Sequence, residues 1–177
     1  ENILIKYVYY YLFTNLDLLQ KGFIGVGLQH ISKEYIHDIK IPIPSLKCQQ
    51  ELVRHLDFIY EKSNKTSLEK MTELNHLNTI CLEMQQLYGI NELKTIEQVC
   101  NIQYGTRIIK KDNISGEYPV YGSGRPMFST NTFNREGYNI LVGRFALSSE
   151  CVRFVNEPIF LNDSGFSIIP KEDTLLH

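Results

Sequence analysis

The sequence predicts an α+β fold in which β-rich segments are joined by one long helix of coiled-coil type. Residues 1–44 combine a helical apolar pattern with a glycine-punctuated loop and an extended run that ends in two prolines. Residues 45–89 carry a heptad frame, with positions spaced alternately by three and four. Residues 90–177 change to short extended runs separated by turn clusters, which is typical of a β-rich unit.

The composition limits the classes of protein to consider. The chain has 177 residues, of which 43% are hydrophobic, enough for a packed core. The formal net charge of −2 gives no global electrostatic case for nucleic-acid binding, so any such case must be local. The four cysteines are scattered without a C-x-x-C pair, which favours reduced thiols in a cytoplasmic protein over a zinc ribbon or a disulfide scaffold.

The first segment is expected to begin with a helix from Ile3 to Lys21, followed by the loop GFIGVGLQH and the extended run YIHDIKIPIP. Polar residues within the apolar part of this helix argue against a signal peptide and a membrane span. The chain begins with Glu1 instead of methionine, so we expect a fragment or a processed form.

The long helix is expected to start directly after the prolines. Pro42 and Pro44 fix an extended backbone, and Ser45 is a good N-cap residue for a helix over residues 46–88. A helix of about 43 residues would be about 65 Å long, too long to fold back onto one core, so it needs a partner helix. The residues expected to pair are Val53, Leu56, Tyr60, Leu74, Leu77, Cys81 and Met84. The middle heptad positions are polar, so two ordinary helices broken near residues 63–67 remain the alternative.

The third segment should be β-rich, and none of its motifs predicts catalysis. Its extended runs are TIEQVCNIQY, YPVYG, NILVGRFAL, CVRFV and FSIIP. The five histidines of the chain lie in different elements without metal-ligand spacing, so no metal site is expected. No nucleophile elbow, phosphate loop or zinc-protease motif is present. The N-D-S-G run at 162–165 could be a nucleophile loop, but a polar turn between strands explains it more simply.

Nucleic-acid binding has more support in this segment. Five of the six arginines fall between Arg107 and Arg153, interleaved with aromatic and polar loop residues. Arginine can read guanine with two hydrogen bonds, asparagine can read adenine, and hydroxyls reach phosphates. The candidate DNA contacts are Arg107, Lys110, Lys111, Tyr121, Ser123, Arg125, Ser129, Thr130, Asn131 and Arg144. The alternative is a solvated loop whose arginines cover the surface, since ten acidic residues offset nine basic ones in residues 90–177.

Around the prolines the sequence resembles a known family. The run GLQHISKEYIHDIKIPIPSLKCQQELVRHL is similar to the end of a target-recognition domain passing into the conserved helix of type I restriction–modification specificity subunits. The runs TIEQVCNIQYGTRI, YPVYGSG and NILVGR resemble the opening of the next recognition domain. One position departs from the family pattern, because Cys48 stands where a glutamate would complete a capping box with Ser45. The residues that carry the resemblance at the joint are Gly27, Gln29, Ile31, Ile41, Pro42, Pro44, Leu46, Gln49, Leu52 and Val53.

The resemblance implies how the chain is divided into domains and which functions belong to partner subunits. Residues 1–44 would end a first target-recognition domain, residues 45–89 would be the spacer helix, and residues 90–177 would begin a second domain. The protein would bind double-stranded DNA at a bipartite site and catalyse nothing itself. A methylation subunit and a restriction subunit would be its partners and would hold S-adenosylmethionine, ATP and magnesium, so no cofactor is expected on this chain.

Other interpretations remain open from the sequence. The chain could be a truncated subunit, or a half-subunit that forms an antiparallel homodimer through residues 46–88. It could be the specificity portion of a fused type II restriction–methyltransferase enzyme. It could also be a coiled-coil adaptor whose β-rich unit binds protein instead of DNA.

Overall fold

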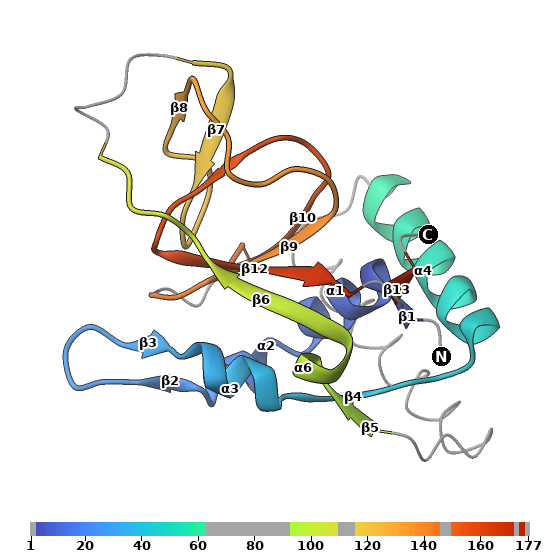
Figure 1. Ribbon diagram of the computed structural model, residues 1–177. Helices are drawn as coiled ribbons and strands as arrows, with labels where there is room; N and C mark the ends of the chain where they lie inside the picture. The colour runs from blue at the N-terminus through green and yellow to red at the C-terminus, as the bar shows by residue number, and fades with distance from the viewer. Residues whose placement is uncertain (1–2, 63–92, 110–115, 146–149, 172–173, 176–177) are drawn as a thin grey trace.

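A four-stranded antiparallel sheet lies at the centre of the computed structural model, which describes residues 3–62, 93–109, 116–145, 150–171 and 174–175 (Figure 1). Its strand order is β10–β9–β12–β6, and residues alternate between its two faces, as strand geometry requires. Ile140 and Val142 face the main core, whereas Leu141 faces a smaller cluster on the other side. The strands are β6 (Cys100–Tyr104), β9 (Asn139–Gly143), β10 (Val152–Val155) and β12 (Gly165–Pro170).

Helices from the first segment cover one face of this sheet. α1 (Ile5–Thr14) packs against β10, where the rings of Tyr9 and Phe154 lie 5.5 Å apart. α2 (Leu16–Gln20) follows, because Asn15 interrupts the predicted helix. α4 (Leu46–Lys62) packs on α1 and lies on the outside of the molecule in Figure 1.

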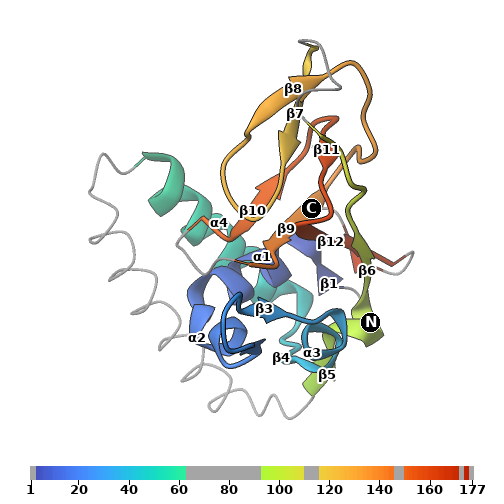
Figure 2. The same ribbon diagram turned by 90° about the vertical axis from the view of Figure 1, so that its left-hand side faces the viewer.

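A smaller sheet covers the other face. It has the order β11–β7–β8 and is formed by β7 (Tyr118–Tyr121), β8 (Phe128–Thr130) and β11 (Phe160–Leu161). Figure 2 shows these strands at the opposite end of the molecule from α2. Leu141, Ile159 and Leu161 form the apolar cluster beneath this sheet. The two sheets together place the β7–β8 loop at the molecular surface.

Two short helices lie inside runs that the sequence predicts to be extended. α3 (Lys33–Asp38) begins where the Ser32 hydroxyl accepts a hydrogen bond from the Tyr35 amide at 3.1 Å. α6 (Ile96–Val99) begins with a capping box between Thr95 and Gln98. The prediction of uninterrupted extended structure was therefore wrong at both places, because local capping decides over the apolar pattern.

The first segment also forms strands that pair with distant residues. β2 (Phe23–Ile24) and β3 (His30–Ile31) make a hairpin within the predicted loop, and Gly25 turns it with a φ of 129° that favours glycine. β4 (Lys40–Pro42) pairs antiparallel with β5 (Leu93–Thr95). β1 (Ile3–Leu4) pairs parallel with β13 (Thr174–Leu175).

One hydrophobic core joins the segments that the sequence analysis assigns to two recognition domains. It runs from Ile3 in β1 through Ile41 to Phe166 and Ile168 in β12. The Ile31 amide also donates to the Arg144 carbonyl at 3.0 Å, which connects the two segments through their backbones. Residues 3–44 and the described part of 90–177 therefore lie on one core, and the assignment to two domains stays a prediction.

The joint between β4 and α4 is held by buried hydrogen bonds. Gln49 is completely buried, and its side chain accepts from the Leu4 amide at 2.8 Å and donates to the Pro44 carbonyl at 2.9 Å. The Tyr7 hydroxyl donates to the Pro42 carbonyl at 2.8 Å. The Ser45 hydroxyl accepts from the Cys48 amide at 3.3 Å, which confirms the predicted N-cap. Both prolines are thereby tied to neighbouring elements.

Only the first part of the predicted long helix lies within the described residues. α4 has 17 residues, and the predicted pairing residues Leu74, Leu77, Cys81 and Met84 lie outside the described residues. The described residues contain no long coiled-coil helix, so this part of the predicted fold stays a prediction. Leu56 is 6% exposed and packs in the chain's own core, so its assignment to a surface that pairs with another helix is corrected.

The other two predicted pairing residues also contact the chain itself. Val53 is partly buried against the core, and Tyr60 meets Phe13 edge to face at 5.9 Å. No helix in the described part of the chain is long and apolar enough to cross a membrane.

Candidate nucleic-acid interface

The loop between β7 and β8, residues 122–127, carries the arginine that the sequence analysis favours as a DNA contact. We call it the Arg125 loop. The Ser123 hydroxyl donates to the Ser164 carbonyl at 2.6 Å and accepts from the Phe145 amide at 3.2 Å. A Cβ on Gly143 would lie 2.6 Å from the Ser123 carbonyl, so only glycine permits this close approach. Ser123, a predicted phosphate contact, is therefore used to fix the base of the loop.

Arg125 extends from this loop into solvent. Its side chain is 80% exposed, and its Nε lies 2.6 Å from Oε1 of Glu150. Among the described residues this carboxylate is its one ion-pair or hydrogen-bond partner. The guanidinium is therefore highly exposed and has one defined partner, the carboxylate of Glu150.

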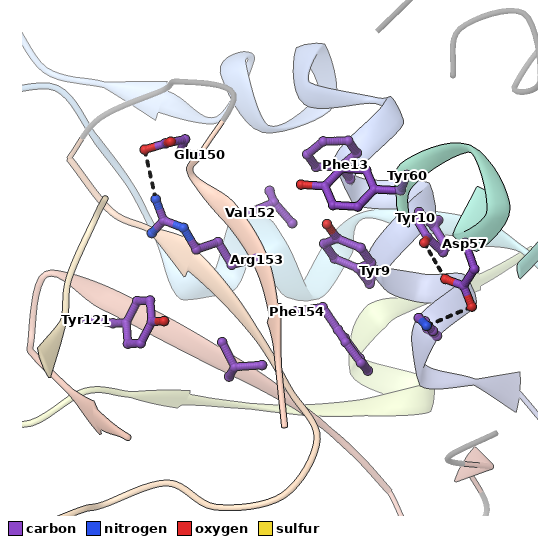
Figure 3. Close-up of a pocket in the computed structure, with 12 residues that line it drawn as sticks. Tyr9, Tyr10, Phe13, Asp57, Tyr60, Tyr121, Glu150, Val152, Arg153 and Phe154 are labelled. Atoms are coloured by element: carbon purple, nitrogen blue, oxygen red, sulfur yellow. Dashed lines mark hydrogen bonds and ion pairs between the residues drawn. The ribbon is translucent and has the colours of Figure 1, made fainter. Parts of the chain in front are cut away.

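Arg153 of β10 also binds the Arg125 loop. Its side chain is 18% exposed, and it donates to the Gly124 carbonyl and to Oε2 of Glu150, the latter at 3.2 Å. Its guanidinium lies 5.8 Å from the centre of the Tyr121 ring. Figure 3 shows Arg153 and Glu150 connected in this way. Arg153 is not among the predicted DNA contacts and belongs only to the arginine cluster of the sequence. The i, i+3 spacing of Glu150 and Arg153 is the signal that could have indicated the pair.

Arg144 and Arg135 form contacts within the fold. Arg144 lies among the rings of Tyr104, Phe145 and Phe166, with its guanidinium 4.9–5.6 Å from their centres. It also donates to the Asp163 carbonyl at 2.8 Å. The structure thus places Arg144, a predicted DNA contact, in a supporting position.

Arg135 donates to the Ser167 hydroxyl at 2.6 Å and to the carbonyls of Asn134 and Tyr104, each at 2.7 Å. Burial lowers the pKa of its guanidinium below the ordinary value. Three of the five clustered arginines, Arg135, Arg144 and Arg153, are thus held by the protein itself. Arg107 and Arg125 are the exposed ones.

The other predicted contacts fall into three groups. Thr130 is 2% exposed, so its assignment as a phosphate contact is corrected. Asn131 is exposed, while Tyr121 and Ser129 are partly buried at the edge of the Arg125 loop. Lys110 and Lys111 lie outside the described residues. The exposed candidates are therefore Arg107, Arg125 and Asn131.

A cavity of about 360 Å³ lies beside this site, between α1, α4 and β10 (Figure 3). The polar groups that line it are already engaged with one another. Asp57 accepts from the Lys6 ammonium at 2.8 Å and from the Tyr10 hydroxyl at 2.5 Å. Burial, with Tyr60 beside it, raises the pKa of the Tyr9 hydroxyl. These pairings connect α1 to α4, so the polar groups of the cavity are bound within the chain.

Comparison with known proteins finds a family model that matches residues 1–78. Residues 1–78 match the family model described as "Type I restriction modification DNA specificity domain", which confirms the resemblance at the joint. The search of curated proteins finds no match.

Two solved structures are similar to the chain. One is the S subunit of a type I restriction–modification system from M. genitalium, with a TM-score of 0.43 and 18% identity over 94% of this chain and 49% of that one. The other is the HsdS subunit from Thermoanaerobacter tengcongensis, with a TM-score of 0.36 and 12% identity over 93% and 49%. The chain thus spans about half the length of each of these subunits.

Proposed function

Because residues 1–78 match the model of type I restriction modification DNA specificity domains, we propose that the chain recognises DNA sequence within such a system. Its ligand is double-stranded DNA, and the chain itself catalyses no reaction. The family match is the observation that carries this proposal. It includes the joint, where the buried amide of Gln49 gives a physical reason for glutamine at that position.

We propose that the Arg125 loop is the part that reads bases. The exposed guanidinium of Arg125 suits the O6 and N7 acceptors of guanine in the major groove. Exposed Arg107 and Asn131 would add contacts to phosphate or to a second base. The net charge of −2 predicts weak binding by the chain alone, so partner subunits would supply much of the affinity.

The partners follow from the same family. A methylation subunit and a restriction subunit would bind S-adenosylmethionine, ATP and magnesium. α4 offers a surface for such a subunit, since Phe58 on it is 63% exposed. The bipartite nature of the DNA site belongs to this proposal as well.

We further propose that residues 1–44 and 90–177 act together as one recognition domain. Their common core and the β4–β5 pairing support this. An antiparallel homodimer through residues 46–88 stays a prediction. The heptad face is the motive for this dimer. The dimer is not needed to bring the two outer segments together, because residues 3–44 and the described part of 90–177 pack on one core within the chain. Light scattering of the purified chain decides between a monomer and a dimer.

Each of the two alternative functions can be distinguished from the proposed one by a specific observation. In a fused type II enzyme, catalytic domains would be encoded on the same chain, so the full-length reading frame decides. A coiled-coil adaptor would bind its partner without DNA, and its complexes would show no preference among DNA sequences. The family match favours DNA recognition over the coiled-coil adaptor.

The proposal is tested by binding to a pool of random duplexes. The chain is combined with its methylation subunit, bound DNA is separated by gel shift, and enriched sequences are read. We expect one enriched motif that survives competition by unrelated DNA. Enrichment of no motif, with a correctly assembled complex, would contradict the proposal.

A further inference from the structure

We propose that Glu150 is a positioning residue that sets the base preference of Arg125, an inference that rests on the proposed function. Its carboxylate bridges two arginines, with Oε1 2.6 Å from Nε of Arg125 and Oε2 3.2 Å from Nη2 of Arg153. A glutamate at this place would hold the guanidinium in one orientation before DNA arrives. It would therefore determine which hydrogen bonds Arg125 can form.

The contacts close a ring around the Arg125 loop. Arg125 binds Glu150, Glu150 binds Arg153, and Arg153 donates to the carbonyl of Gly124. Gly124 is the residue directly before Arg125, so the ring returns to its starting point. The backbone at Gly124 and the side chain of Arg125 are thus both fixed to β10.

The geometry leaves the reading end of Arg125 available. Glu150 engages Nε, which is the inner nitrogen of the guanidinium. The two terminal nitrogens have no hydrogen-bond or ion-pair partner among the described residues, and the side chain is 80% exposed. These two nitrogens can form the paired hydrogen bonds to O6 and N7 of guanine.

Stability does not explain the arrangement. An ion pair with an arginine that is 80% exposed contributes little to folding, because solvent screens the charges. An acidic side chain at a DNA-binding surface also repels phosphate. Glu150 therefore opposes non-specific affinity, and its contribution is the fixed orientation of Arg125.

Repulsion of phosphate by Glu150 weakens binding to all sequences, whereas orientation of Arg125 favours one sequence. Substitutions can separate these two effects. If Glu150 acted only through its charge, Glu150→Gln would tighten binding to every sequence equally. If it positions Arg125, the same substitution lowers discrimination at the base pair that Arg125 reads. Glu150→Asp keeps the negative charge but shortens the side chain by one methylene. It therefore shows whether the position of the carboxylate matters when its charge is unchanged.

The experiment uses the complex of the full chain with its methylation subunit. Dissociation constants are measured for the enriched site and for sites with single base-pair changes. Wild type, Arg125→Ala, Glu150→Gln and Glu150→Asp are compared, with Glu136→Gln as the control. Glu136 is exposed, so its substitution makes the same charge change without touching the ring. Thermal unfolding of each variant shows that the fold is kept.

We expect Arg125→Ala to lose discrimination at one base pair and both Glu150 variants to lose roughly tenfold at the same pair. Glu136→Gln should keep the wild-type discrimination. Unchanged discrimination in both Glu150 variants would overturn the role of Glu150 while the proposed function stands. Full discrimination by Arg125→Ala would likewise overturn it. A wild-type complex without sequence preference would overturn the proposed function as well.

Discussion

The joint at residues 42–49 and the Arg125 loop are both held by a few polar contacts, but they differ in burial and charge. At the joint, the neutral amide of a fully buried Gln49 satisfies two backbone groups. In the Arg125 loop, an ion pair with an 80% exposed arginine lies at the surface. Buried neutral hydrogen bonds stabilise geometry, whereas an exposed charge is available for a ligand. The comparison indicates that the joint maintains the fold, and under the proposed function the loop is the surface that would meet DNA.

Substitution of Gln49 should have the largest effect on stability. Gln49→Ala leaves the Leu4 amide and the Pro44 carbonyl without their partner inside the protein. Each buried unsatisfied group costs about 1–3 kcal/mol, so we expect a loss of about 2–6 kcal/mol for the two groups. Urea unfolding measures it. Exposed Gln50 is the matched control, and Gln50→Ala should change stability by less than about 0.5 kcal/mol. Equal effects of the two substitutions would refute the role of Gln49.

Two tyrosines test the joint with a smaller change. Tyr7→Phe removes the buried hydrogen bond to the Pro42 carbonyl, which has a length of 2.8 Å, and should destabilise by about 1–2 kcal/mol. Tyr11→Phe removes an exposed bond of 3.3 Å to the Lys40 carbonyl and should be close to neutral. Thermal unfolding of both variants gives the comparison. A neutral Tyr7→Phe would show that the joint does not depend on this contact.

Stability should fall in alkaline solution because of Cys100 in β6. Burial raises the pKa of this thiol from 9.0 to about 12. A raised folded-state pKa favours the folded state below the unfolded pKa, and this contribution is lost as the pH rises from 9 towards 12. We expect a loss of about 1.4 kcal/mol at pH 10, since one pKa unit is worth that amount.

Unfolding in urea at pH 8 and pH 10 measures this loss. Cys100→Ala should reduce the difference between the two pH values. An unchanged difference would mean that other groups account for it.

The smallest stability effect is expected in the Arg125 loop. Arg125→Ala should alter the free energy of unfolding by less than about 0.5 kcal/mol, because the pair with Glu150 is screened by solvent. Urea unfolding checks this directly. A loss as large as that of Gln49→Ala would remove the distinction between joint and loop.

The sequence predicted the parts of the fold that depend on neighbouring residues. The α+β class is confirmed, as are the helix start at Leu46 and the cap at Ser45. α3 and α6 are missed because Ser32 and Thr95 cap short helices within runs that are predicted to be extended.

Contacts between distant residues could not be predicted in this way. The roles of the arginines depend on Glu150, Gly124, Asp163 and Ser167, which only the fold brings near them. The common core of the first and third segments likewise depends on the β1–β13 and β4–β5 pairings. A heptad pattern predicts an apolar face but does not state whether that face packs within the chain or against another one.

The central claim is that Arg125 reads a guanine, and methylation interference tests it most directly. Methylation of guanine N7 blocks the acceptor that the guanidinium would use. Duplexes carrying the enriched site are methylated sparsely, bound by the complex with the methylation subunit, and the bound and unbound pools are mapped. We predict that wild type is blocked at one particular guanine and that Arg125→Ala is not. The same interference pattern for both proteins would contradict the claim.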